Sequence, residues 1–377
     1  MFTMQSTWKE IRTANVLDHA LGDLFPTYWL RLLTDEQDEK TMEQIHETVC
    51  MEWGEAFWSK PLVNSANMIL ETAQKQNFMF VPLWKKQPDG WIPDADLNNE
   101  EGVWLFTGNP KKDNQAFYHF TDCESVPPYP STAVPEEKRQ QEGRRPAVIL
   151  CPGGGYEMIS YYSEGIQLAQ RMERDGGYKA FILSYRIKPN TYPQSQMDLA
   201  LAIMHVRANA DCYGIDPDRI VVVGASAGGH LCASTAMLHE ELKQEIFRAH
   251  PELTASYKEV SARPDGVGLL YPVISFTEEY HEGSYLFNTG EKPGLREKLS
   301  VELHDLTGFP VTYAYANLDD GCVPASNTTR LDAALQKAGV VHLCQTFPTG
   351  DHGIGLGYQT SAKTWSEEML RFFEENM

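Results

Sequence analysis

A serine enclosed by small residues is the first candidate for chemistry in this sequence. Residues 221–230 read VVVGASAGGH, so Ser226 follows an apolar run typical of a buried strand and precedes a helix-forming segment. The pattern G-x-S-x-G between a strand and a helix is typical of a nucleophile elbow, where small neighbours permit a strained turn and leave the serine hydroxyl accessible. We therefore predict Ser226 as a nucleophile, with a tight structural turn as the alternative.

A run of three glycines follows another apolar segment. It reads CPGGGY at residues 151–156. Backbone N–H groups in such a run can approach a developing oxyanion, and we expect donors from Gly154, Gly155 and Ala227. A phosphate-binding loop is the alternative, but the Lys-Ser/Thr or GxGxxG continuation of such loops is missing. Tyr156, directly after the glycines, is a candidate residue of the acyl or leaving-group pocket.

Two later strand ends supply a carboxylate and an imidazole. The stretch YAYANLDDGCVP offers Asp319 and Asp320, and FPTGDHGIGLG carries His352 between glycines. A carboxylate can hold an imidazole in the tautomer that accepts the proton of a serine hydroxyl. Each residue alone also has a structural interpretation, since an Asp before glycine forms turns and most single histidines are structural. The order serine, acid, histidine after successive strands favours a catalytic set.

The segments around these residues alternate between apolar runs and helical patterns. Strands are expected at 147–151, 179–186, 219–225, 265–275, 309–316 and 340–347. Helices are expected at 163–177, 195–214, 227–242, 324–339 and near the C-terminus. Continuous apolar strands that alternate with helices predict an α/β fold, with a mostly parallel central sheet covered by helices on both faces. Ligands bind such sheets beyond the carboxyl ends of the strands, where the candidate residues lie.

The N-terminal quarter differs from the rest in composition. Residues 1–95 carry six of the eight tryptophans and a helical pattern of apolar residues. We expect a largely helical extension, as a lid or interface, followed by a catalytic domain at 96–377. Packing onto that domain is the favoured role of the rings, and sugar stacking or a contact between copies of the chain are the alternatives. Segments 102–106 and 116–120 are expected to pair as strands.

Charge and cysteine usage exclude several classes of function. The 377 residues carry a formal charge of −20, which argues against nucleic-acid binding and disfavours anionic membrane surfaces. The seven cysteines are scattered without CxxC or Cys/His ligand spacing, so no metal site or disulfide framework is expected. The N-terminal residues lack the pattern of a signal peptide, and no run of 18 apolar residues occurs. A cytoplasmic protein is expected.

Taken in order, the motifs resemble those of the α/β-hydrolase superfamily, and more narrowly its acetyl esterase/acetylxylan-esterase-like carboxylesterases (the BD-FAE-like "sugar hydrolases"). The similar segments lie between about residues 145 and 375 and include PAVILCPGGGY, YSEGIQLAQRM and IDPDRIVVVGASAGGHLCAS. The resemblance implies the nucleophile Ser226 and the base His352. It selects Asp320 as the acid, four residues before the proline of D-x-x-V-P. ANLDD departs from the family's HTADD or HGTxD, and the insertion 276–308 is not covered.

The resemblance also implies an activity. It predicts a serine carboxylesterase for short acetyl esters, with acetylated sugars as substrates, an acyl-enzyme intermediate and no metal or organic cofactor. The same residues are compatible with an amide or peptide hydrolase, which the motifs alone do not distinguish. A ligand-binding protein without turnover is a further alternative, which the complete set of candidate residues disfavours.

Overall fold

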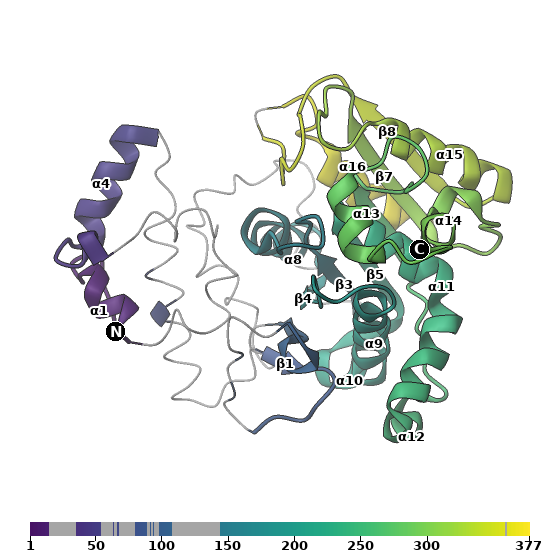
Figure 1. Cartoon of the computed structure of the whole chain (residues 1–377), viewed down its shortest axis with the longest axis horizontal. Coiled ribbons are helices and arrows are strands. Elements are labelled where there is room, and N and C mark those ends of the chain that lie inside the picture. The colour runs from purple at the N-terminus through teal and green to yellow at the C-terminus, as the bar shows by residue number, and fades with distance from the viewer. Residues whose placement is uncertain are drawn as a thin grey trace.

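The computed structural model of the chain consists of short N-terminal segments and a long continuous body. It describes residues 1–14, 35–53, 63, 66–67, 80–88, 91, 93, 98–107, 144–358 and 360–377. Two N-terminal helices, α1 (Trp8–Arg12) and α4 (Met42–Trp53), lie to one side of the body in Figure 1. Among the described residues, no helix combines the length and apolar character needed to cross a membrane. The strand expected at 116–120 lies outside these residues.

Eight strands form one sheet in the order β1-β2-β4-β3-β5-β6-β7-β8. Their bounds are β1 Phe80–Pro82, β2 Trp104–Phe106, β3 Arg145–Cys151, β4 Lys179–Ser184, β5 Ile215–Ala225, β6 Gly266–Leu270, β7 Val311–Asn317 and β8 His342–Phe347. The pairs β1–β2 and β2–β4 are antiparallel, and all other neighbouring strands are parallel. The carboxyl ends of the parallel strands therefore meet at one edge of the sheet, as expected for this fold class.

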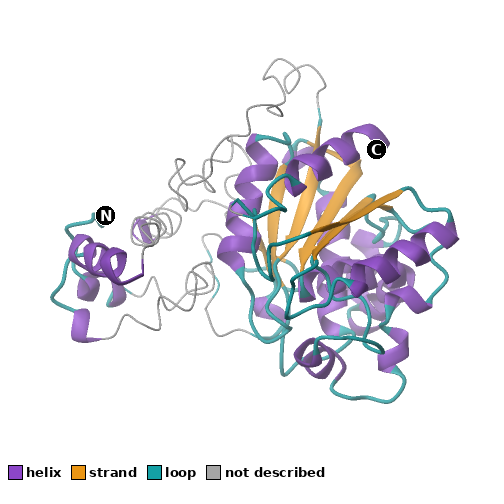
Figure 2. Cartoon of the chain, turned by 90° about the horizontal axis from the view of Figure 1, so that it is seen from above, coloured by secondary structure: helices purple, strands orange, loops and turns teal. Residues whose placement is uncertain are grey.

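Helices cover both faces of the sheet (Figure 2). The longer ones are α8 (Gln167–Arg174), α9 (Gln194–Ala208), α11 (Ala227–Ala249), α15 (Ser326–Ala338) and α16 (Trp365–Asn376). The shorter ones are α10 (Ala210–Tyr213), α12 (Thr254–Tyr257), α13 (Glu282–Thr289) and α14 (Leu295–Lys298), and a single π-helical turn spans Tyr162–Ile166. The expected helices thus form, and the segment 163–177 divides into the π turn and α8.

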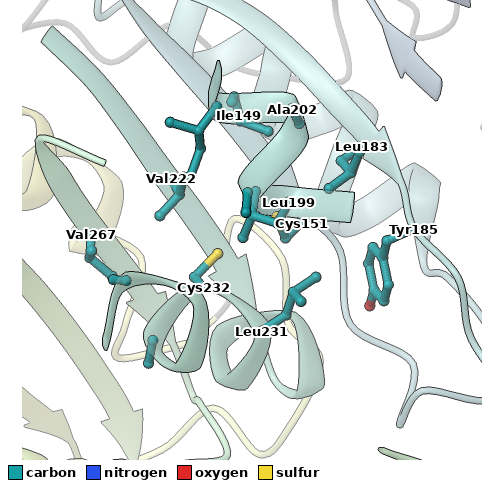
Figure 3. Close-up of a cluster of buried hydrophobic side chains, with 14 of the residues drawn as sticks. Ile149, Cys151, Leu183, Tyr185, Leu199, Ala202, Val222, Leu231, Cys232 and Val267 are labelled. Atoms are coloured by element: carbon teal, nitrogen blue, oxygen red, sulfur yellow. The ribbon is translucent and has the colours of Figure 1, made fainter. Parts of the chain in front are cut away.

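Successive residues of the central strands pack on opposite faces, because side chains alternate along a strand. Ile149 and Val222 belong to the core that includes α9 and α11 (Figure 3). Their neighbours Val148 and Val221 belong to the second core, with α8 and α16. Both faces of the sheet are therefore buried, which explains why these strands read as uninterrupted apolar runs.

Strands β1 and β2 bear on two expectations for the N-terminal part. Within segment 102–106, β2 pairs with β1 on one edge and with β4 on the other, and the partner expected at 116–120 lies outside the described residues. The sheet also begins before residue 95, since β1 lies at 80–82. The separation of a lid or interface at 1–95 from a catalytic domain at 96–377 stays a prediction.

One N-terminal tryptophan packs directly onto the main body. Trp84 is buried, and its indole Nε1–H donates to Asp198 Oδ1 over 2.7 Å. The Arg186 guanidinium bonds the same carboxylate and lies 5.0 Å from the Trp84 ring centroid, while the His250 ring lies 4.8 Å away. Packing is therefore the role of this ring. Trp29 and Trp58 lie outside the described residues.

The start of α11 lies in direct contact with the end of β3. A Cβ atom added to Gly228 would stand 1.9 Å from the Cys151 carbonyl oxygen. One added to Gly224 would stand 2.1 Å from the Gly228 carbonyl oxygen. Real Cβ atoms do not approach backbone this closely, so both positions require glycine. The helix can reach the sheet here only because these side chains are absent.

Replacing Gly228 by alanine should therefore destabilise the fold. The inserted methyl group must push α11 away from β3, at a cost of about 1–3 kcal/mol or more. Chemical denaturation measures this as a lower midpoint. The control is Gly321→Ala, because a Cβ at this exposed glycine would meet no atom within 4 Å. Equal midpoints for the two variants would contradict the close contact.

Stability should also fall as the pH is lowered from about 6.5 to about 4. Burial lowers the pKa of His230 and of His205 to about 4. In this range an unfolded histidine, with a pKa of about 6.5, binds a proton that the folded one does not, so acid favours unfolding by up to about 3 kcal/mol per residue. Denaturation midpoints of His205→Gln and His230→Gln should depend less on pH than those of the wild type. Unchanged slopes in both variants would refute this.

Candidate active site

Ser226 occupies a strained turn between β5 and α11. Its φ of 53° and ψ of −119° are rarely adopted by residues other than glycine. Hydrogen bonds hold it there: its N–H donates to the Leu270 carbonyl (2.9 Å), and its carbonyl accepts from His230 N–H (3.2 Å) and Val273 N–H (3.1 Å). The residue is 6% exposed. The turn thus fixes the hydroxyl-bearing residue at the N-terminal end of α11, where the helix dipole favours negative charge.

The structure brings Ser226, His352 and Asp320 together. His352 Nε2 lies 2.9 Å from Ser226 Oγ, and its Nδ1 lies 2.7 Å from Asp320 Oδ2. Since the carboxylate can only accept, Nδ1–H donates to Asp320 and the Nε2 lone pair faces the serine hydroxyl. The Asp320 side chain is fully buried, and its Oδ1 accepts N–H groups from Cys322 and Val323, each at 2.8 Å. This arrangement can transfer a proton from Ser226 to His352.

Asp319, the other carboxylate of the same stretch, bonds to the backbone before His352 instead of to the imidazole. It accepts the N–H groups of Gly350 and Asp351, both at 2.9 Å. The buried Asn317 side chain donates to the Asp351 carbonyl at 2.8 Å. Both residues belong to ANLDD, where the sequence departs from the expected family pattern. They fasten the segment just before His352 to the end of β7.

The glycine run lies beside the serine turn. A Cβ atom on Gly153 would stand 2.9 Å from Ser226 Cβ, so the two backbones are in contact. Gly154 and Gly155 have φ values of 128° and 66°, which side-chain-bearing residues rarely adopt. Among the described residues, no partner accepts the N–H groups of Gly154, Gly155 or Ala227. The glycine run and the first residue of α11 therefore carry three N–H groups without an acceptor in the described part of the chain.

Tyr156 does not line a pocket, contrary to the sequence-based expectation. It is 1% exposed, and its O–H donates to His230 Nδ1 over 2.8 Å. The His230 Nε2–H donates in turn to the Leu299 carbonyl at 2.9 Å, which fixes the neutral tautomer. Burial raises the pKa of the Tyr156 phenol well above its usual value. The ring anchors the glycine run to α11 instead of facing a ligand.

Glu164 is a buried carboxylate that the sequence did not identify. It accepts Gly153 N–H at 2.7 Å and the Tyr271 hydroxyl at 2.9 Å. Burial raises the pKa of Glu164, while these two hydrogen bonds and the nearby His352 oppose that rise. One acidic residue in a segment expected to be helical does not indicate burial. The segment itself, YSEGIQLAQRM, belongs to the motifs that resemble the family.

The insertion 276–308 contributes His281. A Cβ atom on Gly155 would meet His281 Cε1 at 3.4 Å, so the imidazole packs against the glycine run. Its Nδ1 accepts Ser284 N–H at 3.1 Å and caps α13. Burial, followed by the nearby His352, lowers the pKa of His281. The sequence offered no reason to select this histidine from the others.

The combined chemistry is that of nucleophilic acyl transfer. A serine hydroxyl contacts an imidazole, a carboxylate bonds the far side of that imidazole, and the glycine run with its N–H groups packs against the serine turn. Within the described ranges, no group of three or more His, Cys, Asp and Glu side chains is placed to hold a metal ion.

Several known proteins are similar to this chain. The BD-FAE family model matches residues 135–281. The crystal structure of the acetyl ester-xyloside bifunctional hydrolase from Caldicellulosiruptor lactoaceticus has 30% sequence identity and a TM-score of 0.60, and the match covers 79% of this chain and 96% of that one. Endo-1,4-beta-xylanase B of Butyrivibrio fibrisolvens is 29% identical over 289 residues, which are 74% of this chain and 43% of the relative.

The acetylxylan esterase of Xylanibacter ruminicola is 29% identical over 221 residues, which are 56% of this chain and 41% of the relative. The chain thus spans less than half the length of these two curated relatives. The match to the Caldicellulosiruptor hydrolase, in contrast, covers nearly all of that chain. Together with the sheet order and the strand–turn–helix at Ser226, this match identifies the chain as a member of the acetyl esterase/acetylxylan-esterase-like (BD-FAE-like) carboxylesterases of the α/β-hydrolase superfamily.

Proposed function

We propose that this protein is a serine carboxylesterase that hydrolyses short-chain acetyl esters, with acetylated sugars such as xylo-oligosaccharides as substrates. The observation that carries the proposal is the 2.9 Å contact between Ser226 Oγ and His352 Nε2, with Asp320 behind the imidazole. No metal or organic cofactor takes part in the proposed reaction.

Acylation begins at the serine hydroxyl. His352 Nε2 accepts the proton as Ser226 Oγ bonds to the ester carbonyl carbon. The carbonyl oxygen becomes an oxyanion, which the N–H groups of Gly154, Gly155 and Ala227 stabilise in this proposal. When the tetrahedral intermediate collapses, the bond to the sugar oxygen breaks, and the protonated His352 gives its proton to that oxygen.

Deacylation repeats these steps with water. His352 accepts a proton from a water molecule, whose oxygen attacks the acetyl carbonyl carbon of the acyl-enzyme. Collapse of the second tetrahedral intermediate breaks the bond to Ser226 Oγ, which regains a proton from His352, and acetic acid is released. Asp320 keeps its proton-free form throughout and stabilises the imidazolium that appears in both halves of the reaction.

The preference for acetylated sugars rests on the relatives. One is named an acetylxylan esterase, and a solved structure is named an acetyl ester-xyloside bifunctional hydrolase. The formal charge of −20 also favours neutral substrates over anionic ones. An acetyl ester on a sugar agrees with the names of these relatives and carries no negative charge.

Esterase activity should depend on Ser226 and decline with acyl-chain length. Steady-state hydrolysis of p-nitrophenyl acetate, butyrate and octanoate is compared with release of acetate from an acetylated xylo-oligosaccharide. Ser226→Ala should lower kcat by about 10⁶-fold, the size seen for the nucleophile of another triad enzyme. Ser234→Ala, which changes a buried serine two turns further along α11, is the matched control and should retain activity.

The same panel separates the alternatives. Octanoate turnover above acetate turnover would refute the acetyl preference. Wild-type activity on a p-nitroanilide amide but on no ester would identify an amide hydrolase, and ligand binding without any Ser226-dependent turnover would identify a binding protein.

The two neighbouring aspartates should differ in effect. Asp320→Asn removes the acceptor that fixes the His352 tautomer, and a loss of about 10⁴-fold in kcat is expected from the corresponding change in another triad enzyme. Asp319→Asn leaves that contact in place and weakens only the hold on residues 350 and 351. Its kcat on p-nitrophenyl acetate should fall far less. A larger loss in Asp319→Asn than in Asp320→Asn would assign the acid to Asp319.

A further inference from the structure

The π-helical turn Tyr162–Ile166 lies between the two loops of the candidate active site. On one side, Gly165 is close to Pro152, because an added Cβ would stand 3.3 Å from the proline Cγ. On the other side, a Cβ on Gly355 would stand 2.9 Å from the Ser163 carbonyl oxygen. Single π-helical turns occur frequently at functional sites. This one contacts both the glycine run and the loop that follows His352.

Glu164 is the central residue of this turn, and both of its carboxyl oxygens are occupied. Oε2 accepts the N–H of Gly153 at 2.7 Å, and Oε1 accepts the hydroxyl of Tyr271 at 2.9 Å. The residue is 5% exposed, so water cannot replace these partners freely. A carboxylate can accept both hydrogen bonds at once, whereas the amide of glutamine offers only one acceptor oxygen.

Tyr271 extends the contact to the histidine loop. Its hydroxyl accepts the N–H of Gly355 at 3.2 Å and donates its own hydrogen to Glu164. These two hydrogen bonds link the histidine loop to the carboxylate. The Trp365 indole donates to the Gly355 carbonyl at 3.0 Å, which holds the same glycine from the other side. The Tyr271 ring also packs edge-on against the His352 ring, with centroids 5.0 Å apart.

We propose that Glu164 is a positioning residue that sets the oxyanion donors and the general base relative to one another. Its carboxylate joins Gly153, which precedes the donor N–H groups of Gly154 and Gly155, to the loop of His352 through Tyr271. This inference rests on the proposed serine-hydrolase function. Without this connection, the glycine-rich loop loses an anchor in a region where glycine gives the backbone its greatest freedom.

The test measures the rate at which a fluorophosphonate modifies Ser226, followed by intact-mass spectrometry. This reaction needs an activated serine and oxyanion donors but no particular ester, so it does not depend on the identity of the substrate. The variants are Glu164→Gln and Tyr271→Phe, both nearly isosteric, together with the double variant. The matched control is Glu173→Gln, which changes another buried glutamate that accepts a backbone N–H, from Ala180 at 3.0 Å, away from the site.

Glu164→Gln should slow phosphonylation by about 10–100-fold, less than the loss of an oxyanion donor itself, and Tyr271→Phe should slow it by a smaller factor. The double variant should be no slower than Glu164→Gln, because both changes break one connection. On p-nitrophenyl acetate, kcat per titrated active site should fall while KM changes less than about threefold. Glu173→Gln should lower the melting temperature without changing either rate.

Three results would overturn the proposal. One is an unchanged phosphonylation rate in Glu164→Gln while the wild type reacts readily. A second is a decrease that matches the loss of folded protein, so that kcat per titrated site stays constant, which would assign Glu164 a purely structural role. A third is strict additivity of the two variants, which would show that they act separately. A wild type that does not react with the fluorophosphonate at all would instead refute the serine-hydrolase function itself.

Discussion

The contact between the first turn of α11 and the end of β3 is the constraint on which the rest of the site depends. Because Gly224 and Gly228 have no side chains, the helix starts directly on the sheet, and Ser226 is forced to a φ of 53°. The same closeness places the backbone of Gly153 against Ser226. The serine hydroxyl, a helix N-terminus and the glycine run therefore converge at this end of the sheet. The strain at Ser226 is stabilised by backbone hydrogen bonds with Leu270 at the end of β6, with Val273 just beyond it and with His230 of α11.

Carboxylates at this edge of the sheet serve mainly to hold backbone in place. Asp320, Glu164 and Asp319 each accept at least one main-chain N–H, and two of the three are buried. Asp320 and Asp319 each fix one loop, whereas Glu164 accepts the N–H of Gly153 and reaches the loop of His352 through Tyr271. The loops beside Ser226 are therefore tied together through buried or well-bonded carboxylates. Acidic residues are abundant in this chain, whose formal charge is −20, and here they act as acceptors for backbone N–H groups. Preorganised backbone dipoles then provide the electrostatic complement to an oxyanion.

The sequence predicted the regular parts of the molecule and three side chains that the structure brings into contact, and it failed where long-range contacts decide. Apolar runs identified the parallel strands β3 to β7, because both faces of the sheet are buried there. The turn at Ser226 could be predicted because its strained backbone requires small residues on both sides, and these are visible in the local sequence. The pairing of β2 with β1 could not be read, since a three-residue strand carries almost no periodicity. The expectation for Tyr156 was wrong because its position next to the glycines does not determine the orientation of its ring. Glu164 and His281 were missed because they reach the site only through contacts between segments that are distant in sequence.

The final residue of the chain lies at the edge of the sheet opposite the reacting groups. A Cβ on Gly266, at the beginning of β6, would meet the Met377 sulfur at 2.8 Å, whereas Leu270 at the other end of that strand hydrogen-bonds Ser226. The four residue steps between these ends span about 13 Å at the usual rise per residue. A substitution at the start of β6 can consequently reach Ser226 only through the strand itself, since the two ends are too far apart for direct contact.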